Sequence, residues 1–383
     1  MTAHASRLHI VILSCNYGGG HHRVAEVLGH ALRQHLPGCH VEIYDYIETC
    51  IGHWYNLTFT SLYFGSVRWA PCLYRWFYRA TSAVSPHSPV QRFINSLGKR
   101  RFAAILQTQR PDLVVCTYCL PAGGMSELRR EGRTDVPCVT VVTDHAVHSQ
   151  WIHPGIDLYL VSSEQVREGM VAHGLSPDRV LATGIPVAPA FGTSPPPQPL
   201  RRRYGLNPSL PTILVMVGAH NLLRGALDVY RHIVELPRPA QLLFVCGKDE
   251  RLRRVIEQLA QSAAKPVRVF GYVNDIPALM AMSDLMISKA GGVTTSEALA
   301  AELPMVLINP IPGQEEENTA FLQAVGAAIV APRPGALPFL IADLLDHPER
   351  LARLREGARR VKRPDAVAHA AEAILSLAPV PVP

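Results

Sequence analysis

A pair of adjacent glycines, Gly291 and Gly292, stands just before a run of helix-compatible residues, Thr295 to Ala301. Glycines ahead of a helix allow backbone N–H groups to approach an anion, and the helix N-terminus adds a partial positive charge. The stretch therefore predicts a binding turn for a diphosphate. An ordinary connection between a strand and a helix, in which the glycines serve only the turn, is the alternative.

Carboxylate and amide side chains accompany this turn. Glu297 lies within the helical run, and Gln314 and Glu315 lie in a polar loop after the apolar run from Met305 to Ile308. Carboxylate and amide oxygens accept hydrogen bonds from hydroxyls. We therefore expect these three side chains to contact sugar hydroxyls.

A second glycine-rich turn lies near the start of the chain and leads to a histidine. Leu8 to Ser14 is a short apolar run typical of a buried strand, and Arg23 to Leu36 carries apolar residues at helical spacing. His21 lies between them, which predicts a place at the carboxyl edge of a parallel sheet, where ligands bind in open α/β folds. The turn lacks a full GxGxxG fingerprint, so a tightly held dinucleotide is not indicated. A helix-capping or surface histidine is the alternative.

A third group of polar residues follows a predicted strand from Pro137 to Val142. Asp144 comes close behind the strand, and His145 and His148 follow. Residues at the carboxyl end of a strand are positioned for ligand contact. The two histidines could ligate a metal at this spacing, but no third ligand is evident, so we expect no metal here.

The composition narrows the class of protein. The chain has 383 residues, of which 48% are hydrophobic and 18% charged, enough for roughly two domains with sizeable cores. Its net charge of +6 suits an anionic ligand or membrane surface, and no nucleic-acid-binding module is present. Eight scattered cysteines suit reduced thiols in the cytoplasm, and no segment is apolar for long enough to predict a membrane-spanning helix.

The segment from Thr49 to Pro111 is unusual because it combines aromatic and basic residues and contains no Asp or Glu. Such a mixture suits the lipid headgroup region, where each cation contributes about 1 kcal/mol. A partly buried pair of helices with arginines facing water is the alternative, and nucleic-acid binding ranks third. The residues expected to contact the membrane or admit the acceptor are Trp54, Trp69, Arg75, Trp76 and Arg79.

Strands alternate with helices in both halves of the chain, which predicts an α/β protein with two doubly wound parallel sheets. A proline-rich stretch between the halves is typical of a semi-rigid linker. We expect an N-terminal domain at 1–192, the linker at 193–211, a C-terminal domain at 212–345 and C-terminal helices at 346–383, which could pack back on the N-terminal domain.

These motifs occur in the same order as in one glycosyltransferase family. NYGGGHHRVAEVL resembles the N-terminal GxGHxxAA element of the family that contains processive diacylglycerol glucosyltransferases and monogalactosyldiacylglycerol synthases. The resemblance covers roughly residues 8–330 and is weakest in the aromatic-basic segment, the linker and the last helices. The other matching stretches are TDHAVHSQWIHPGIDLYLVSS, GIPV, VMVGAH, VCGK, GYVNDIPALMAMSD and SKAGGVTTSEALAAELPMVLINPIPGQEEEN.

The resemblance implies a GT-B fold, in which two Rossmann-like domains face each other across a cleft. It also implies that a hexose passes from a UDP-sugar to the hydroxyl of diacylglycerol with inversion. His21 matches the family's general base, a role that suits an imidazole with a pKa of about 6.5. Asp144 would orient or tune the acceptor side, in the domain that also binds the membrane.

The donor would bind in the C-terminal domain. The sequence has no DxD triplet, so backbone amides and the helix dipole would neutralise the diphosphate, and no metal or other cofactor is expected. The residues so implied are Gly292, Val293 and Thr294 for the diphosphate, Glu297 for the ribose, Gln314 and Glu315 for the donor sugar, Tyr272 and Val273 for the uracil, and Gly218 and His220 for the phosphates.

The sugar is the least determined part of this prediction. PIPGQEEEN looks closer to the glucosyltransferases, which favours UDP-glucose over UDP-galactose. A lipid-linked N-acetylglucosaminyltransferase, a UDP-sugar 2-epimerase and a non-catalytic UDP-sugar sensor at the membrane are further alternatives. The expected partners are a UDP-hexose, diacylglycerol and the anionic cytoplasmic face of a membrane, without nucleic acid.

Overall fold

A computed structural model gives the structure of the chain. It describes residues 8–16, 19–52, 65, 69–82, 84–85, 88–193, 196–216, 226–308 and 310–379. The chain divides into two compact units. The first consists of Met1–Gly65, Leu73–Val187 and Asp365–Pro383, and the second of Ser66–Cys72 and Ala188–Pro364.

The described residues of the first unit form a six-stranded parallel sheet. The sheet begins at the edge with β2, places β1 beside it and then runs through the remaining strands in sequence order. These strands are β1 (His9–Ser14), β2 (His40–Asp45), β3 (Leu113–Cys116), β4 (Cys138–Val141), β5 (Leu158–Leu160) and β6 (Val180–Leu181).

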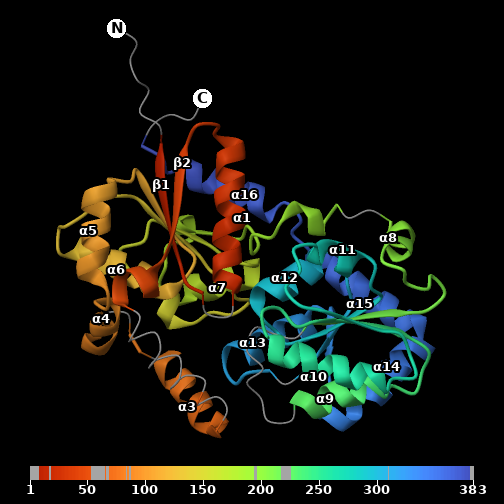
Figure 1. The fold of residues 1–383 in the computed structure, drawn as a ribbon. Helices are drawn as coiled ribbons and strands as arrows, with labels where there is room; N and C mark the ends of the chain where they lie inside the picture. Colours follow the sequence, from red (N-terminus) through yellow and green to blue (C-terminus); the bar gives the residue numbers. More distant parts are fainter. Residues whose placement is uncertain are drawn as a thin grey trace. The chain divides into compact units, whose positions relative to one another are not determined.

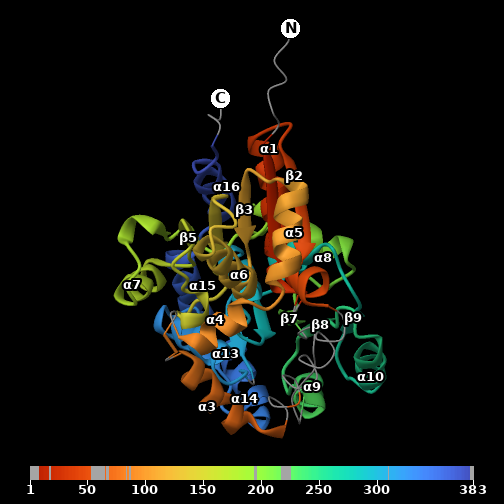
Figure 2. The same cartoon turned by 90° about the vertical axis from the view of Figure 1, so that its left-hand side faces the viewer.

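Helices cover both faces of this sheet. On one face α1 packs against α16, the last helix of the chain, while α5 and α6 cover the other face (Figures 1 and 2). The helical segments of this unit are α1 (Gly20–His35), η1 (Ile47–Ile51), α3 (Pro71–Ser82), α4 (Pro89–Asn95), α5 (Lys99–Gln109), α6 (Cys119–Arg130), η2 (Ser149–Trp151), α7 (Glu164–Ala172), η3 (Pro177–Arg179) and α16 (Ala366–Leu375).

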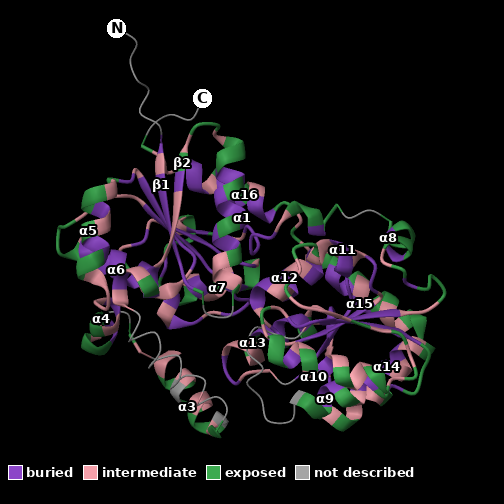
Figure 3. Cartoon of the chain, in the orientation of Figure 1, coloured by how far each residue is buried: buried purple, intermediate pink, exposed green. Residues whose placement is uncertain are grey.

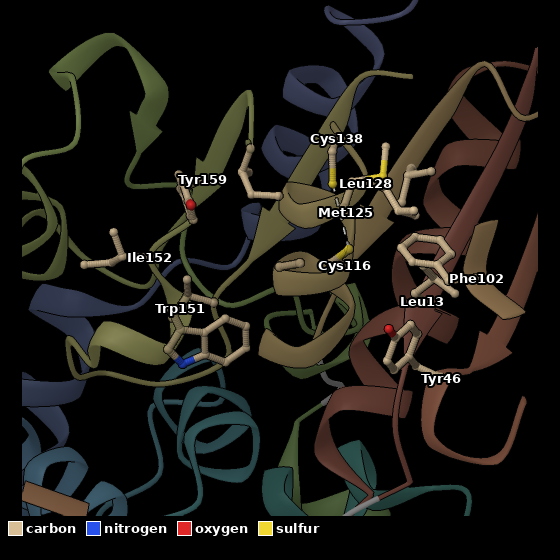
Figure 4. Packing of buried hydrophobic residues seen from close by; sticks show 14 of the residues in the cluster. Leu13, Tyr46, Phe102, Cys116, Met125, Leu128, Cys138, Trp151, Ile152 and Tyr159 are labelled. Carbon is tan, nitrogen blue, oxygen red and sulfur yellow. Dashed lines mark hydrogen bonds between the residues drawn. The ribbon is translucent and has the colours of Figure 1, made fainter. Parts of the chain in front are cut away.

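The apolar core lies between the sheet and its helices, as the buried strands of Figure 3 show. Successive side chains of a strand point to opposite faces, so Val11 and Leu13 pack towards α5 and α6. There Phe102 meets Tyr46 edge to face with 5.6 Å between ring centroids (Figure 4). A Cβ at Gly124 would meet the Tyr46 hydroxyl at 2.7 Å, so only glycine lets α6 approach so closely.

The described residues of the second unit also form a six-stranded parallel sheet. Its spatial order is β12, β11, β10, β7, β8 and β9, so β10 lies beside the first strand of the unit. The strands are β7 (Thr212–Met216), β8 (Gln241–Val245), β9 (Val267–Phe270), β10 (Leu285–Ser288), β11 (Met305–Leu307) and β12 (Ala328–Val330).

The helices of the second unit connect these strands and cover the sheet. Among them, α15 packs against α12 and α14. The helical segments are η4 (Pro189–Phe191), α8 (Pro197–Arg203), α9 (Ala226–Val234), α10 (Glu250–Gln261), α11 (Ile276–Ala281), α12 (Gly292–Ala300), α13 (Gln314–Ala324), η5 (Pro334–Ala336), α14 (Leu337–Asp346) and α15 (Pro348–Val361).

The structure differs from the sequence analysis in three places. The proline-rich stretch is not only a linker, because α8 lies within it and Arg201 donates to the Met282 carbonyl and to Asp284. The last helices separate, since α15 belongs to the second unit and α16 to the first. Finally, the expected polar loop at residues 314–318 is the start of helix α13, where the Glu316 carboxylate accepts from the Gly313 N–H and caps the helix.

No helix among the described parts of the chain is both long enough and apolar enough to cross a membrane.

Gly357 provides a test of the packing in the second unit. A Cβ at this position of α15 would overlap the backbone carbonyl group of Gly326. We expect Gly357→Ala to lower the free energy of unfolding, because overpacking costs about 1–3 kcal/mol and the opposing backbone cannot rotate away. The gain in helix propensity, about 1 kcal/mol, does not offset this. Urea unfolding of the purified variants measures the difference.

Gly335→Ala is the matched control, since a Cβ there would meet nothing within 4 Å. A Gly357→Ala variant as stable as the Gly335→Ala variant would contradict the packing described here.

Candidate active site

His21 is the second residue of α1, immediately beyond the carboxyl end of β1. Its Nδ1 lies 2.9 Å from the Thr117 carbonyl oxygen and 2.8 Å from Thr143 Oγ1. The Thr117 hydroxyl in turn donates to the His21 carbonyl at 3.1 Å. The half-buried imidazole is thus held by residues that follow β3 and β4, the next strands of the sheet.

These contacts define which ring nitrogen of His21 carries the proton. A backbone carbonyl can only accept, so Nδ1 must donate to Thr117 and the neutral ring bears its lone pair on Nε2. Burial lowers the pKa of His21, while the Asp144 carboxylate and the Thr117 carbonyl raise it by smaller amounts. At neutral pH the side chain is therefore a neutral imidazole that can accept a proton at Nε2.

Aromatic rings flank the imidazole of His21. The Tyr118 ring meets it edge to face at 5.0 Å between centroids, and the Trp151 ring is tilted against it at 6.3 Å. Trp151 itself is buried in the apolar core of the first unit (Figure 4). The two rings pack against the histidine, and burial is the largest cause of its lowered pKa.

The loop after β4 carries three of the residues expected from the sequence, and one of them, Asp144, acts on the pKa of His21. Asp144, His145 and His148 are all buried. His148 has a structural role, because both of its ring nitrogens contact backbone groups. Its Nδ1 accepts from the Gln150 N–H at 3.1 Å and its Nε2 lies 3.3 Å from the Tyr78 carbonyl. Burial lowers the pKa of His148, which keeps it neutral.

Helix α3 carries Arg75, Trp76 and Arg79 of the aromatic-basic segment, and this loop holds the helix in place. The Ser149 hydroxyl donates to the Thr81 carbonyl at 2.8 Å, and the rings of Tyr78 and His148 lie 4.4 Å apart. A pair of amide side chains, the buried Gln91 and the half-buried Gln150, ties the next helix, α4, to the same loop. The loop beside His21 is therefore joined directly to both helices.

The structure places most of the residues expected to meet a membrane. Trp69 and Trp76 are exposed, at 65% and 67%, although large aromatic side chains are usually covered. Arg79 is exposed and Arg75 is half-buried. Trp54 lies outside the described residues.

In the second unit, Gly291 caps the N-terminus of α12, which begins at Gly292 directly after β10. Gly291 has an ordinary φ of −69°, and a Cβ there would meet nothing within 4 Å. Neither the turn nor the packing requires a glycine at this position, which argues against the ordinary-turn alternative. The residue leaves open space beside N–H groups that have no partner within the helix.

The starts of helices α12 and α13, which carry the expected donor residues, are joined by a hydrogen bond. The buried Asn318 side chain of α13 donates to the Ala290 carbonyl at 3.0 Å, ahead of α12. The Glu315 carboxylate accepts from the Ile311 N–H at 2.7 Å. Burial lowers the pKa of Lys289, and the charge of Glu315 opposes that shift. The adjacent strands β10 and β11 thus bring together the N-termini of two helices.

The other expected donor residues are only partly described. Gly292 and Val293 are buried in the first turn of α12, and Thr294, Glu297 and Gln314 are half-buried. Tyr272 is 66% exposed after β9, with the Lys248 ammonium 5.5 Å from its ring centroid, and Val273 is half-buried. Gly218 and His220 lie outside the described residues.

Sequence reasoning missed three residues that shape these sites. Thr143 was not predicted as a site residue, although it directly precedes Asp144 and has a hydroxyl group. Asn318 is the last residue of the matching motif, but no role was predicted for it. The Thr117 backbone carbonyl leaves no signal in the sequence, because every residue has one.

The sequence of the chain is related to that of characterised enzymes over nearly its whole length. It is 30% identical over 370 residues to the processive diacylglycerol beta-glucosyltransferase of Bacillus cytotoxicus, an alignment that covers 96% of this chain and 93% of the relative. The chain belongs to the diacylglycerol glycosyltransferase family. The enzyme of the same name from Bacillus cereus strain B4264 is 31% identical over 371 residues, with the same coverage.

Family models agree with this membership in the diacylglycerol glycosyltransferases. Residues 21–187 match the family described as monogalactosyldiacylglycerol (MGDG) synthase, and residues 200–361 match glycosyl transferases group 1. The transferase activity that the sequence predicts is therefore confirmed at the level of the family.

Solved structures confirm the GT-B fold of this glycosyltransferase. MurG of Acinetobacter baumannii is 16% identical, with a TM-score of 0.63 and coverage of 96% of this chain and 99% of that chain. MnaA of S. aureus, solved with UDP, is 14% identical, with the same TM-score and coverage of 96% of each chain. At these identities the likeness shows the fold alone.

Asp144 allows a test of the electrostatics around His21. The Asp144 carboxylate raises the pKa of His21 against the larger effect of burial. We therefore expect Asp144→Asn to lower the pKa of His21 further, because the imidazolium loses a nearby negative charge. An NMR titration of the imidazole C–H signals, with His21→Gln to assign them, measures the shift.

Asp178→Asn is the control, since Asp178 is exposed and far along the chain from the histidine loop. An unchanged or raised His21 pKa in Asp144→Asn would show that this carboxylate does not act on the ring.

Proposed function

We propose that this glycosyltransferase moves a hexose, with glucose favoured, from a UDP-sugar to the hydroxyl of diacylglycerol and forms a β-glycosyl diacylglycerol. The observation that carries the proposal is the similarity to processive diacylglycerol beta-glucosyltransferases over 96% of the chain. The geometry of His21 and of the α12 turn supplies groups that suit each half of the reaction.

His21 acts on the acceptor in this proposal. Its neutral Nε2 accepts the proton of the diacylglycerol hydroxyl while the hydroxyl oxygen bonds to the anomeric carbon of the sugar. The bond from that carbon to the diphosphate breaks at the same time, its electron pair leaves with UDP, and the configuration inverts. The hydrogen bond from Nδ1 to Thr117 holds the ring in the tautomer that this step needs. Asp144 is a positioning residue that stabilises the imidazolium as it forms.

The donor binds at the second unit in this proposal. The N–H groups of Gly292, Val293 and Thr294 and the dipole of α12 stabilise the diphosphate as negative charge develops on it. This arrangement needs no metal, in keeping with the absence of a DxD triplet. Lys289 adds a positive charge behind the turn when it is protonated.

Hydrogen-bond acceptors and an aromatic ring complete the donor site. Glu297 would bind the ribose hydroxyls, and Gln314 with Glu315 would bind the hydroxyls of the sugar. The exposed ring of Tyr272 offers a surface for the uracil. The remaining residues assigned to the nucleotide are Val273, Gly218 and His220.

The lipid acceptor would enter from the membrane beside α3. The exposed Trp69 and Trp76 suit the headgroup region, and Arg75 and Arg79 suit anionic lipid. The hydrogen bonds between α3 and the loop beside His21 support a short route from the membrane to the base. We place the enzyme on the cytoplasmic face of the membrane.

One observation keeps UDP-galactose as a second candidate donor. The family model that matches residues 21–187 is described as monogalactosyldiacylglycerol synthase. Glucose and galactose differ only in the configuration of one hydroxyl group. One or two side chains can therefore determine which UDP-sugar the enzyme prefers.

A product assay tests the proposal directly. Purified protein is incubated with diacylglycerol liposomes and, in separate reactions, UDP-glucose, UDP-galactose or UDP-N-acetylglucosamine, and the lipid products are identified by mass spectrometry. We expect hexosyl diacylglycerol with UDP-glucose. His21→Ala should lower the rate about 10²–10⁴-fold, the usual contribution of a general base, while UDP binding is retained.

His22→Ala is the matched control, because the adjacent His22 lies 3.6 Å from Glu26 on the helix surface. If wild type and His21→Ala form glycolipid at the same rate, His21 is not the general base. Absence of lipid product with every donor, from protein that binds UDP, would favour the sensor alternative.

The membrane part of the proposal has its own test. We expect the full chain to sediment with anionic liposomes, and the double variant Trp69→Ser with Trp76→Ser to bind less. Binding should also weaken as the ionic strength rises from about 0.05 to about 0.5 M, because salt screens exposed charges. Liposome co-sedimentation measures the bound fraction.

Phe339→Ser is the control for exposed aromatic residues, since Phe339 is 74% exposed on α14, outside the aromatic-basic segment. If the protein ignores anionic liposomes at low salt, or if the tryptophan variant binds as wild type does, this part of the proposal fails.

A further inference from the structure

A cluster of metal-ligating side chains lies at the amino end of the first sheet. His9 begins β1, and His40 and Glu42 lie on β2. The strands pair in register with His9 opposite His40, and residues two apart on a strand share a face. One donor atom from each of the three side chains lies within 4.8 Å of the others. The cluster is therefore a direct product of the strand register.

The hydrogen bonds of His9 orient its lone pair into the cluster. Its Nδ1 lies 3.0 Å from the Gln109 carbonyl, which can only accept, so the neutral ring carries its lone pair on Nε2. That Nε2 is shielded from solvent and has no hydrogen-bond partner among the described residues. It lies 3.9 Å from a Glu42 carboxylate oxygen. Two acceptors thus face each other, and a cation between them would satisfy both.

The remaining groups fit the same conclusion. His40 Nε2 lies 3.0 Å from the other Glu42 oxygen and is more than half exposed, so the cluster is open to solvent on one side. The Tyr44 hydroxyl donates to Glu42 at 2.5 Å, and Gln109 donates to Tyr44. Hydrogen bonds of this kind orient metal ligands in known sites. Among the described residues no lysine or arginine pairs with Glu42.

We propose that His9, His40 and Glu42 bind a divalent transition-metal ion, with zinc as the first candidate, that joins the edge strand β2 to β1. Two imidazoles and one carboxylate with an open position form a donor set that suits Zn²⁺ better than Mg²⁺ or Ca²⁺, which prefer oxygen ligands. The three positions play no part in the transfer proposed above.

The site is separate from the proposed chemistry. His9 and Ser14 are the first and last residues of β1, about 16 Å apart along a strand, and His21 lies beyond Ser14. It is also unrelated to His145 and His148, the pair considered from the sequence. The ion would stabilise the edge of the sheet, since a ligand that binds only the folded state raises its stability.

The test uses the full-length chain without an affinity tag, freed of metal with a chelator. Isothermal titration with ZnCl₂ at pH 7.5 should show one equivalent bound, and the melting temperature should rise by several degrees with excess zinc. His40→Ala and Glu42→Gln should each weaken zinc binding at least about tenfold, because each removes one ligand. Both positions are near the surface, and circular dichroism checks that the variants fold.

His173→Ala is the control for the many other histidines, since His173 is exposed and its ring bonds only to the Gly169 carbonyl of its own helix. Substitution with Co²⁺ gives an independent signal, a visible absorption band that the His40→Ala variant should lose. Absence of stoichiometric zinc binding in wild type, or equal affinity in wild type and both cluster variants, would overturn the proposal.

Discussion

The hydrogen bond from His21 Nδ1 to the Thr117 carbonyl is the constraint on which the candidate acceptor site depends. It selects the tautomer of the ring and aims the lone pair of Nε2 away from the protein backbone. The bond exists because β3 lies beside β1, so that the end of one strand meets the first turn of the helix after the other. Burial then keeps the imidazole neutral by lowering its pKa. Backbone geometry and desolvation therefore hold the ring in one neutral tautomer, and the buried Asp144 carboxylate opposes the lowering of its pKa.

The same arrangement links the base to the aromatic-basic segment. The loop from Thr143 to Trp151 holds the ring of His21 at one end and helix α3 at the other. The paired amides of Gln91 and Gln150 fix α4 to this loop, and the buried amide of Gln91 would be costly to leave unpaired. Helix α3, with its exposed Trp76, and the imidazole of His21 are therefore held by the same polar loop.

The candidate site of the second unit would stabilise a negatively charged ligand through backbone dipoles. Its candidate donor site depends on the N-terminus of α12, where Gly291 leaves the backbone N–H groups accessible. Asn318 of helix α13 donates a hydrogen bond to the Ala290 carbonyl and so joins α13 to this turn. A diphosphate at such a turn is stabilised by fixed dipoles, which need no reorganisation during the reaction. Each unit of the GT-B fold thus has its own candidate site, held in place by hydrogen bonds.

Sequence reasoning recovered most strands and the long helices, because apolar periodicity records which face of each element is buried. It was wrong about residues 314–318, where Gly313 and three glutamates look like a loop but cap and begin a helix. It also could not assign the last two helices to separate units. The apolar periodicity of a helix shows which face is buried, but not which element covers that face. The helix start depends on a local cap, whereas the packing of α16 against α1, which the sequence analysis had considered, and of α15 within the second unit depends on tertiary contacts.

For function, the sequence by itself determined the fold class, the family and the order of the motifs that contain His21 and the α12 turn. Only the tertiary structure decided which nitrogen of His21 can accept a proton, and that Thr143 and Asn318 support the two sites. It also brought His9, His40 and Glu42 together across two strands. The reason is physical: motifs follow the chain, whereas hydrogen bonds between side chain and backbone join residues far apart in sequence.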